Sequence, residues 1–260
     1  MKKQLFFFLL TFFSLLAPAI AQVNDNPINV LSEKLLQNEL LSNRFLRNAV
    51  FIKTNTFKKK ALSDMDKSLA KFDDNLSYII LHLPYDREIK DQYLKLQNLW
   101  NVYRLKVTDY ENLKYKSLVV KTRMLEEQIS DLNKSILREH PAYSRNKKAF
   151  EEAKYVIDNG KMVDKIATAY VLKNGLNFPE AFNYFDIDFG ELRKNLKKLR
   201  KYEPIKKNAA DLLLDLNTNI QAMEAMMNKT AYNPKMMYST VNSYSKKSFK
   251  LLDYILQTIK

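Results

Sequence analysis

The chain contains no cysteine, only three glycines and seven prolines in 260 residues. Without cysteine no disulfide bond can form, so packing alone must hold the fold, and thiol nucleophiles and thiolate metal sites are excluded. So little glycine and proline, against 46% hydrophobic residues, favours long helices over strands and turns. We therefore expect an all-α protein with no sheet.

Catalytic motifs are also missing from the chain. There is no H-E-x-x-H, no G-x-S-x-G and no glycine-rich phosphate loop, so the usual zinc, nucleophile and nucleotide signatures are absent. The two histidines, His82 and His140, fall at the expected ends of helices, where a role in solvation or dipole compensation is typical. We expect no enzyme activity, no metal site and no cofactor.

Residues 1–21 have the pattern of a secretory signal peptide. Lys2 and Lys3 precede an apolar run over 5–16, and Ala19 and Ala21 supply the small-residue cleavage pattern, which places the cut near Ala21. An uncleaved membrane anchor is the alternative. No later stretch is apolar enough to span a bilayer, so we expect a periplasmic or extracellular protein of the bacterial envelope without a transmembrane segment after cleavage.

Apolar residues recur at steps of three and four in two places, which predicts helices packed in a bundle. The first seam precedes Pro84 and contains Leu62, Met65, Leu69, Phe72, Leu76, Ile79 and Leu83. About 120 positions later a second seam precedes Pro204 and contains Phe182, Phe185, Phe189, Leu192, Leu196 and Leu199. Asp64 and Asp73 are expected to face outward from the first seam.

The repeated seams predict two tandem up-down four-helix bundles, over 22–140 and 141–260, the second a diverged copy of the first. A single array of eight helices is the alternative. Expected helices cover about 28–54, 62–83, 86–108, 118–140, 149–174, 178–199, 204–227 and 234–255. We expect a loop near Asp109 rather than one long helix, and a kink or break at 186–188, where Gly190 weakens the helix.

Two polar residues, Asn38 and Ser42, interrupt the apolar stripe of the first helix. Polar residues in such a seam usually fix the register of packing. A ligand-binding role is the second interpretation, and it makes Asn38 and Ser42 the candidate small-molecule site.

Positive charge dominates, with a formal net charge of +14. The densest basic segment shows Arg193, Lys194, Lys197, Lys198 and Lys201 on the side of a helix opposite its apolar seam. For a secreted protein this favours an anionic polymer or an envelope protein as partner, and not nucleic acid. A solvated helix face without a partner is the alternative.

Methionines gather around the expected turn between the last two helices, at Met223, Met226, Met227, Met236 and Met237. Thioether sulfur could bind copper(I) in an oxidising compartment. Filling of the core by flexible side chains is the simpler interpretation, and no metal site is assigned.

Several segments have a recognisable order: Ile28-Asn29-Val30, Leu35-Leu36, Phe45, 68–76 and the LQNLW run from Leu96 to Trp100. They resemble the N-terminal sensor module of type IV pilus methyl-accepting chemotaxis transducers, a helical bundle also found in nitrate/nitrite-responsive histidine kinases. In the second half, Ala167, Ala169 and Tyr170 resemble the end of that module's first helix.

The resemblance implies a ligand-sensing bundle, which in some family members binds a small anion through arginines of the first helix. The positions of those arginines fall here on Glu33 and Leu35, and near Asp158 and Gly160 in the second half. An acidic or apolar residue cannot clamp an oxyanion, so the resemblance supports the scaffold and not the anion site.

These observations predict a non-enzymatic, sensor-like protein that binds a ligand or partner protein and does not itself transmit a signal. A structural or adaptor protein that acts through its basic helix face is the alternative. A homodimer through the first helix of either half is a further expectation.

Overall fold

The computed structural model describes residues 27–138, 141–229 and 231–258. Within these ranges the regular structure is helical and contains no strand, which confirms the predicted all-α class. The signal peptide predicted over 1–21 and the helix-end role predicted for His140 lie outside the described residues. No helix of the described part combines the length and apolar character that crossing a membrane requires.

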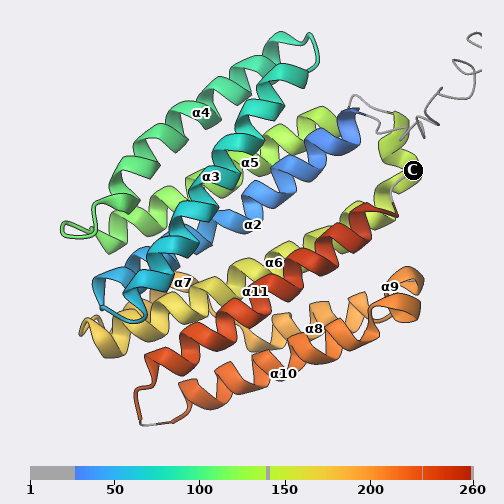
Figure 1. Cartoon of the computed structure of the whole chain (residues 1–260). Helices are drawn as coiled ribbons and strands as arrows, with labels where there is room; N and C mark the ends of the chain where they lie inside the picture. Colours follow the sequence, from blue (N-terminus) through green and yellow to red (C-terminus); the bar gives the residue numbers. More distant parts are fainter. Residues whose placement is uncertain (1–26, 139–140, 230, 259–260) are drawn as a thin grey trace, which may run out of the picture.

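The first half consists of α2 (Pro27–Lys53), α3 (Lys58–His82), α4 (Arg87–Thr108) and α5 (Tyr115–Arg138) (Figure 1). Pro84 separates α3 from α4, and the Asp86 carboxylate caps α4 by accepting from the Ile89 amide at 2.9 Å. The predicted loop after Asp109 is present, because α4 ends at Thr108 and α5 begins at Tyr115.

The second half consists of α6 (Pro141–Gly175), α7 (Ala181–Phe185), α8 (Phe189–Leu199), α9 (Glu203–Asn208), α10 (Ala210–Met227) and α11 (Pro234–Leu256). The predicted break at 186–188 is confirmed: Asp186 is left-handed (φ 47°), and Asp188 caps α8. The prediction of one helix from Pro204 to Met227 is wrong. The chain leaves helical geometry at Ala209, where φ is −136°, and this separates α9 from α10.

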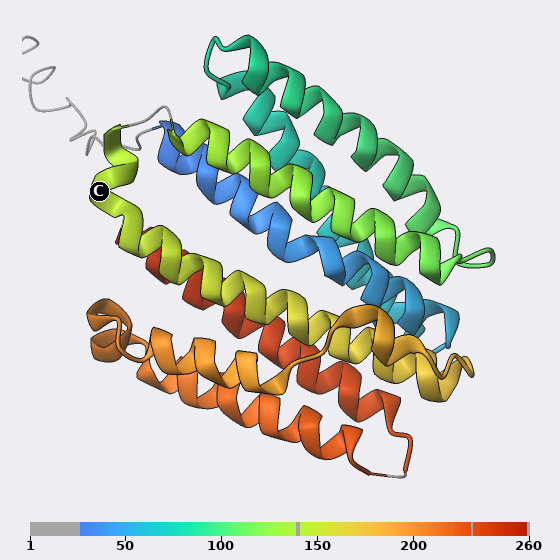
Figure 2. The same ribbon diagram turned by 180° about the vertical axis from the view of Figure 1, so that it is seen from behind.

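The helices form layers, seen from both sides in Figures 1 and 2. In the first half α4 lies outermost, and α3 and α5 lie on either side between α4 and α2; in the second half α11 and α8 lie on either side between α6 and α10. Helix α2 packs against α3, α5 and α6, and α6 packs against α2, α7, α8 and α11. The two halves therefore meet through their first helices.

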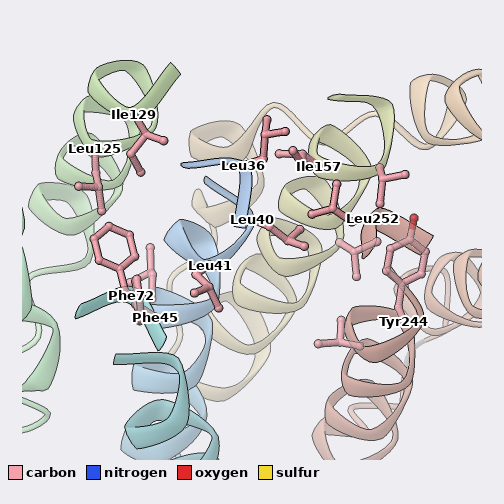
Figure 3. Close-up of a cluster of buried hydrophobic side chains, with 14 of the residues drawn as sticks. Leu36, Leu40, Leu41, Phe45, Phe72, Leu125, Ile129, Ile157, Tyr244 and Leu252 are labelled. Carbon is pink, nitrogen blue, oxygen red and sulfur yellow. The ribbon is translucent and has the colours of Figure 1, made fainter. Parts of the chain in front are cut away.

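This contact explains why α2 is buried on nearly every side. The sequence predicted one apolar stripe that includes Leu31, Leu35 and Phe45, but Leu36, Leu40, Leu41, Leu46, Val50 and Phe51 are also at most 5% exposed. In Figure 3, Phe45 lies beside Phe72 and Leu125, whereas Leu36 and Leu40 point toward Ile157 of α6. One helix thus contributes to the cores of both halves.

Aromatic side chains fill the centre of the first half. Trp100 stacks on Phe72 with ring centroids 4.0 Å apart, and Phe45 packs against both rings. The indole Nε1 of Trp100 donates to Asp73 at 2.7 Å, which satisfies its polar edge. Asp73, expected to face outward, is instead a partner of this cluster.

Gly160 is where α6 comes closest to α2. A Cβ atom at this position would collide with Cδ1 of the buried Leu40. We expect Gly160→Leu to lower the free energy of unfolding by about 1–3 kcal/mol, since overpacking forces neighbouring side chains and backbone to move. Urea denaturation followed by helical circular dichroism measures this loss.

Combining Gly160→Leu with Leu40→Ala supplies the control. Because the second change opens space for the first, the double variant should lose less stability than the sum of the two single variants. Additive losses would show that the two positions are not in contact.

Candidate functional site

An ion pair is fully buried where α2, α6 and α11 meet. The Arg47 guanidinium lies 2.7 Å from Asp164 Oδ1, and both side chains are 1% exposed. Arg47 also donates to Asn48 Oδ1 at 2.9 Å and to Ser245 Oγ at 3.2 Å. A buried charge is tolerated only with such partners, so α2, α6 and α11 must keep this register for the pair to form.

A second arginine, Arg44, lies one turn earlier on α2. Its Nε and Nη2 atoms are buried without a hydrogen-bond partner, and its guanidinium carbon lies 4.7 Å from the Phe249 ring centroid. Burial lowers the pKa of Arg44 to about 10, and the neighbouring Arg47 acts in the same direction while Asp164 opposes it. Arg44 is therefore a buried cation without an ion pair in the described part of the chain.

Asp64 of α3 forms a further link between the halves. Its carboxylate accepts from the Tyr238 hydroxyl at 2.6 Å and from the Asn242 amide at 3.1 Å, both on α11. The expectation that Asp64 faces outward is therefore wrong. The heptad pattern placed it on the exposed side of its own bundle, but that side is covered by the other half.

Lys161 of α6 is surrounded by carboxylates. Its Nζ lies 2.7 Å from Glu39, 3.5 Å from Glu126 and 3.6 Å from Asp158. Burial by itself lowers the pKa of Lys161, but these three carboxylates together raise it above its ordinary value. Lys161 therefore stays protonated and ties α2, α5 and α6 together.

The two residues predicted as a ligand site, Asn38 and Ser42, are both 0% exposed. Asn38 donates to the Phe72 carbonyl at 3.4 Å and accepts from Asn75 at 2.8 Å. Ser42 donates to the Glu39 carbonyl at 2.7 Å and lies 3.3 Å from Glu126. A hollow beside the neighbouring Asn43 is too narrow to admit a water molecule. Ligand binding by Asn38 and Ser42 stays a prediction.

The Asn38 arrangement recurs in the second half. Asn159 donates to the Leu192 carbonyl at 3.1 Å and accepts from Asn195 at 3.0 Å. In each half an asparagine of the first helix thus holds the backbone and an asparagine of the next helix. Asn159 follows Asn38 by 121 positions, whereas Asn195 follows Asn75 by 120 positions. The spacing within the two asparagine pairs therefore differs by one residue.

The structure brings the predicted basic residues together on the outer side of α8. Arg193 pairs with Glu224 of α10 at 2.6 Å, and Lys194 pairs with Glu191 at 3.1 Å. Lys197 and Lys201 are exposed and make no ion pair within the described ranges, as is also true of Arg200 and Lys207. We use the name basic face for seven residues: Arg193, Lys194, Lys197, Lys198, Arg200, Lys201 and Lys207.

The basic face extends onto α6 through residues that the sequence did not single out. Lys198 Nζ lies 4.2 Å from the Tyr155 ring centroid, and Lys148 Nζ lies 5.6 Å from that of Tyr202. Below them, Glu152 is 8% exposed, and burial raises its pKa. Helical spacing could have placed Lys148 and Tyr155 on one side of α6, because they are seven residues apart, but only packing brings them next to Tyr202 and Lys198.

The methionines near the last turn do not share one environment. Met223, Met226 and Met237 are core residues, whereas Met236 is 48% exposed. Within the described ranges, no three histidine, aspartate or glutamate side chains are grouped so that they could hold a metal ion.

Comparison with known proteins found no matching family model, no matching curated protein and no matching solved structure. The resemblance to chemotaxis sensor modules therefore rests on the sequence pattern alone.

We expect Arg47→Met to lower the free energy of unfolding by about 3–5 kcal/mol, because it leaves Asp164 buried and unpaired. Urea denaturation measures the loss. The double variant Arg47→Met, Asp164→Leu removes both charges and should recover much of that stability. A double variant as unstable as the single one would contradict the assignment of the loss to an unpaired carboxylate.

We expect Lys161→Met to destabilise the fold by about 3 kcal/mol near neutral pH, because Glu39 and Glu126 lose their shared cation. The two carboxylates then remain close to each other in a largely buried site without the cation that compensates their charge. Thermal unfolding measures the loss. Lys165→Met, on the same helix but without an ion pair in the described part, should not show it.

Proposed function

We propose that the protein is a non-enzymatic, extracytoplasmic adaptor whose basic face docks an anionic partner, either an acidic envelope protein or an anionic polymer. The observation that carries this proposal is the four exposed cations that α8, α9 and the turn between them carry without an ion pair in the described part of the chain: Lys197, Arg200, Lys201 and Lys207. Long-range attraction by such a group raises the rate of encounter with anions and concentrates them at the surface.

The location outside the cytoplasm rests on the signal peptide pattern of residues 1–21. The basic face itself favours a partner that is large and polyanionic. Lysine side chains act as flexible point charges, which suit a repeating anion better than one small ligand that needs fixed geometry.

We further propose that the fold arose by duplication and consists of two four-helix units, α2 to α5 and α6 to α11. The repeated asparagine pairs, Asn38 with Asn75 and Asn159 with Asn195, support this relation. The sensor-like resemblance is retained only at the level of this scaffold.

A small-molecule sensor is less well supported by the geometry. Asn38 and Ser42 already have partners in the protein, and a ligand would have to displace them. A homodimer through the first helix of either half would require α2 and α6 to separate, because they pack against each other. The outer surface therefore offers the better-supported site.

Reversing the charge at Lys194, Lys197 and Lys201 to glutamate should weaken binding to poly-L-glutamate roughly tenfold or more in low salt, because attraction becomes repulsion. Fluorescence anisotropy of a labelled polyanion measures the affinity. Wild-type binding should fall steeply as salt is added.

The matched control reverses Lys90, Lys95 and Lys106, three exposed lysines of α4. It changes the net charge equally, so it should weaken binding far less if the basic face is the site. Equal weakening by both triple variants would mean that only overall charge matters, and would overturn the proposal.

A further inference from the structure

A second exposed cluster lies where the α2–α3 turn meets the start of α11. Its apolar side chains are Phe57, Tyr232 and Met236, which are 41%, 38% and 48% exposed. Five exposed lysines lie in the same two segments: Lys58, Lys59, Lys60, Lys229 and Lys235. We call these eight residues the aromatic corner.

Cation–π and ring contacts tie the two segments of the aromatic corner together. The Lys235 Nζ lies 6.0 Å from the Phe57 ring centroid, and the Phe57 ring lies 5.5 Å from that of Tyr238 on α11. Lys60 Nζ lies 5.7 Å from the same Tyr238 ring. Phe57, Lys60 and Lys235, although far apart in the sequence, are thus neighbours of one another or of Tyr238.

The backbone at Phe57 is unusual. Its φ and ψ are 49° and 39°, the left-handed region, in which asparagine and glycine are at ease and a bulky side chain is strained. A large aromatic residue is therefore held at the tip of a turn, partly in solvent, in a conformation that does not suit it. Strain of this kind accompanies functional positions.

The charges of the aromatic corner are not balanced by the protein. None of its five lysines makes an ion pair among the residues that the structure describes. The nearest acid on α3, Asp64, is already engaged by Tyr238 and Asn242. The aromatic corner therefore exposes three apolar side chains beside five lysines that have no ion pair in the described part of the chain.

We propose that the aromatic corner binds the surface of an anionic lipid bilayer. Lysines outside the bilayer would contact anionic headgroups, while Phe57, Tyr232 and Met236 enter the interfacial region, where amphipathic and aromatic side chains are favoured. A polyanion in water offers nothing to the apolar tips. A stable protein interface generally buries on the order of 1,000 Å² or more, which two convex turns do not provide.

This inference is independent of the basic face. The aromatic corner lies at the α10–α11 end of the molecule, and α9 lies at the opposite end (Figures 1 and 2). Helix α10, with 18 residues, spans about 27 Å between α9, which carries Lys207, and the aromatic corner, whereas Arg193 of the basic face pairs with Glu224 near the corner end of α10. Separate variants can therefore test the two surfaces.

The test is co-sedimentation of the full chain with vesicles of phosphatidylglycerol and phosphatidylcholine in equal parts, compared with phosphatidylcholine alone. We expect binding to the anionic vesicles only, weakened by salt. Reversing Lys58, Lys59 and Lys235 to glutamate should weaken it roughly tenfold or more. Reversing Lys194, Lys197 and Lys201 on the basic face should leave most of the vesicle binding intact.

Phe57→Asn separates membrane binding from folding. Asparagine suits the left-handed backbone, so the melting temperature should stay the same or rise, while vesicle binding falls several-fold through loss of the apolar tip. A variant that melts earlier but still binds vesicles would show that Phe57 serves folding only and would overturn the proposal.

The absence of cysteine allows the bound orientation to be measured. A polarity-sensitive dye on Lys59→Cys should shift to the blue when anionic vesicles are added, and the same dye on Lys207→Cys, at the opposite end, should not. A shift at Lys207 alone, or no binding to anionic vesicles in low salt, would also overturn the proposal. Neither result would bear on polyanion binding by the basic face.

Discussion

The packing of α2 against α6 is the constraint on which the rest of the structure depends. It joins the two halves through their first helices and removes α2 from solvent on nearly every side. Gly160 permits the close approach, because any side chain there would collide with Leu40. The remaining helices are then arranged in layers on either side of this central contact.

Charge inside that contact makes it specific rather than simply strong. A buried ion pair such as Arg47 with Asp164 gains little net stability over a well-packed apolar pair, because both charges must first leave water. It does penalise every register in which the partners are separated. Lys161, shared by Glu39 and Glu126, has the same effect near the edge of the interface. We infer that these charges select one arrangement of the two halves among several that apolar packing alone would allow.

Helical periodicity was sufficient to predict the fold class, most helix positions, the loop after Asp109 and the break before Asp188. Each of these depends on local signals: apolar spacing, proline, and residues that cap helices. The gap between α9 and α10 was missed because Ala209 carries no such signal. The partial burial of Asp64 and the burial of the second side of α2 were missed for a different reason. A seam reveals packing partners among neighbouring helices of the same half, but it contains no information about helices of the other half that cover the outer face.

The same distinction between local sequence signals and tertiary packing applies to the candidate surfaces. Most of the basic face could be predicted because Arg193, Lys194, Lys197 and Lys198 lie on one short helix, so their spacing alone places them together. Lys148 and the aromatic corner could not, because their members come from segments that meet only after folding. Phe57 is the clearest case: its sequence context, just before three lysines, resembles an ordinary solvated turn. Only the left-handed backbone and the contact with α11 distinguish it.

Polar side chains in the interior bond to other groups of the protein, and this limits where a ligand could bind. Asn38, Ser42, Arg47 and Lys161 are all engaged in holding helices together, so any ligand there would compete with the fold. Surface lysines do not hold helices together in this way. Exposed apolar side chains are stabilised only when another molecule covers them. A rigid core that exposes such groups in two places is therefore suited to bridging two different surfaces. The length of α10 between Lys207 of the basic face and the aromatic corner provides the span that such bridging needs.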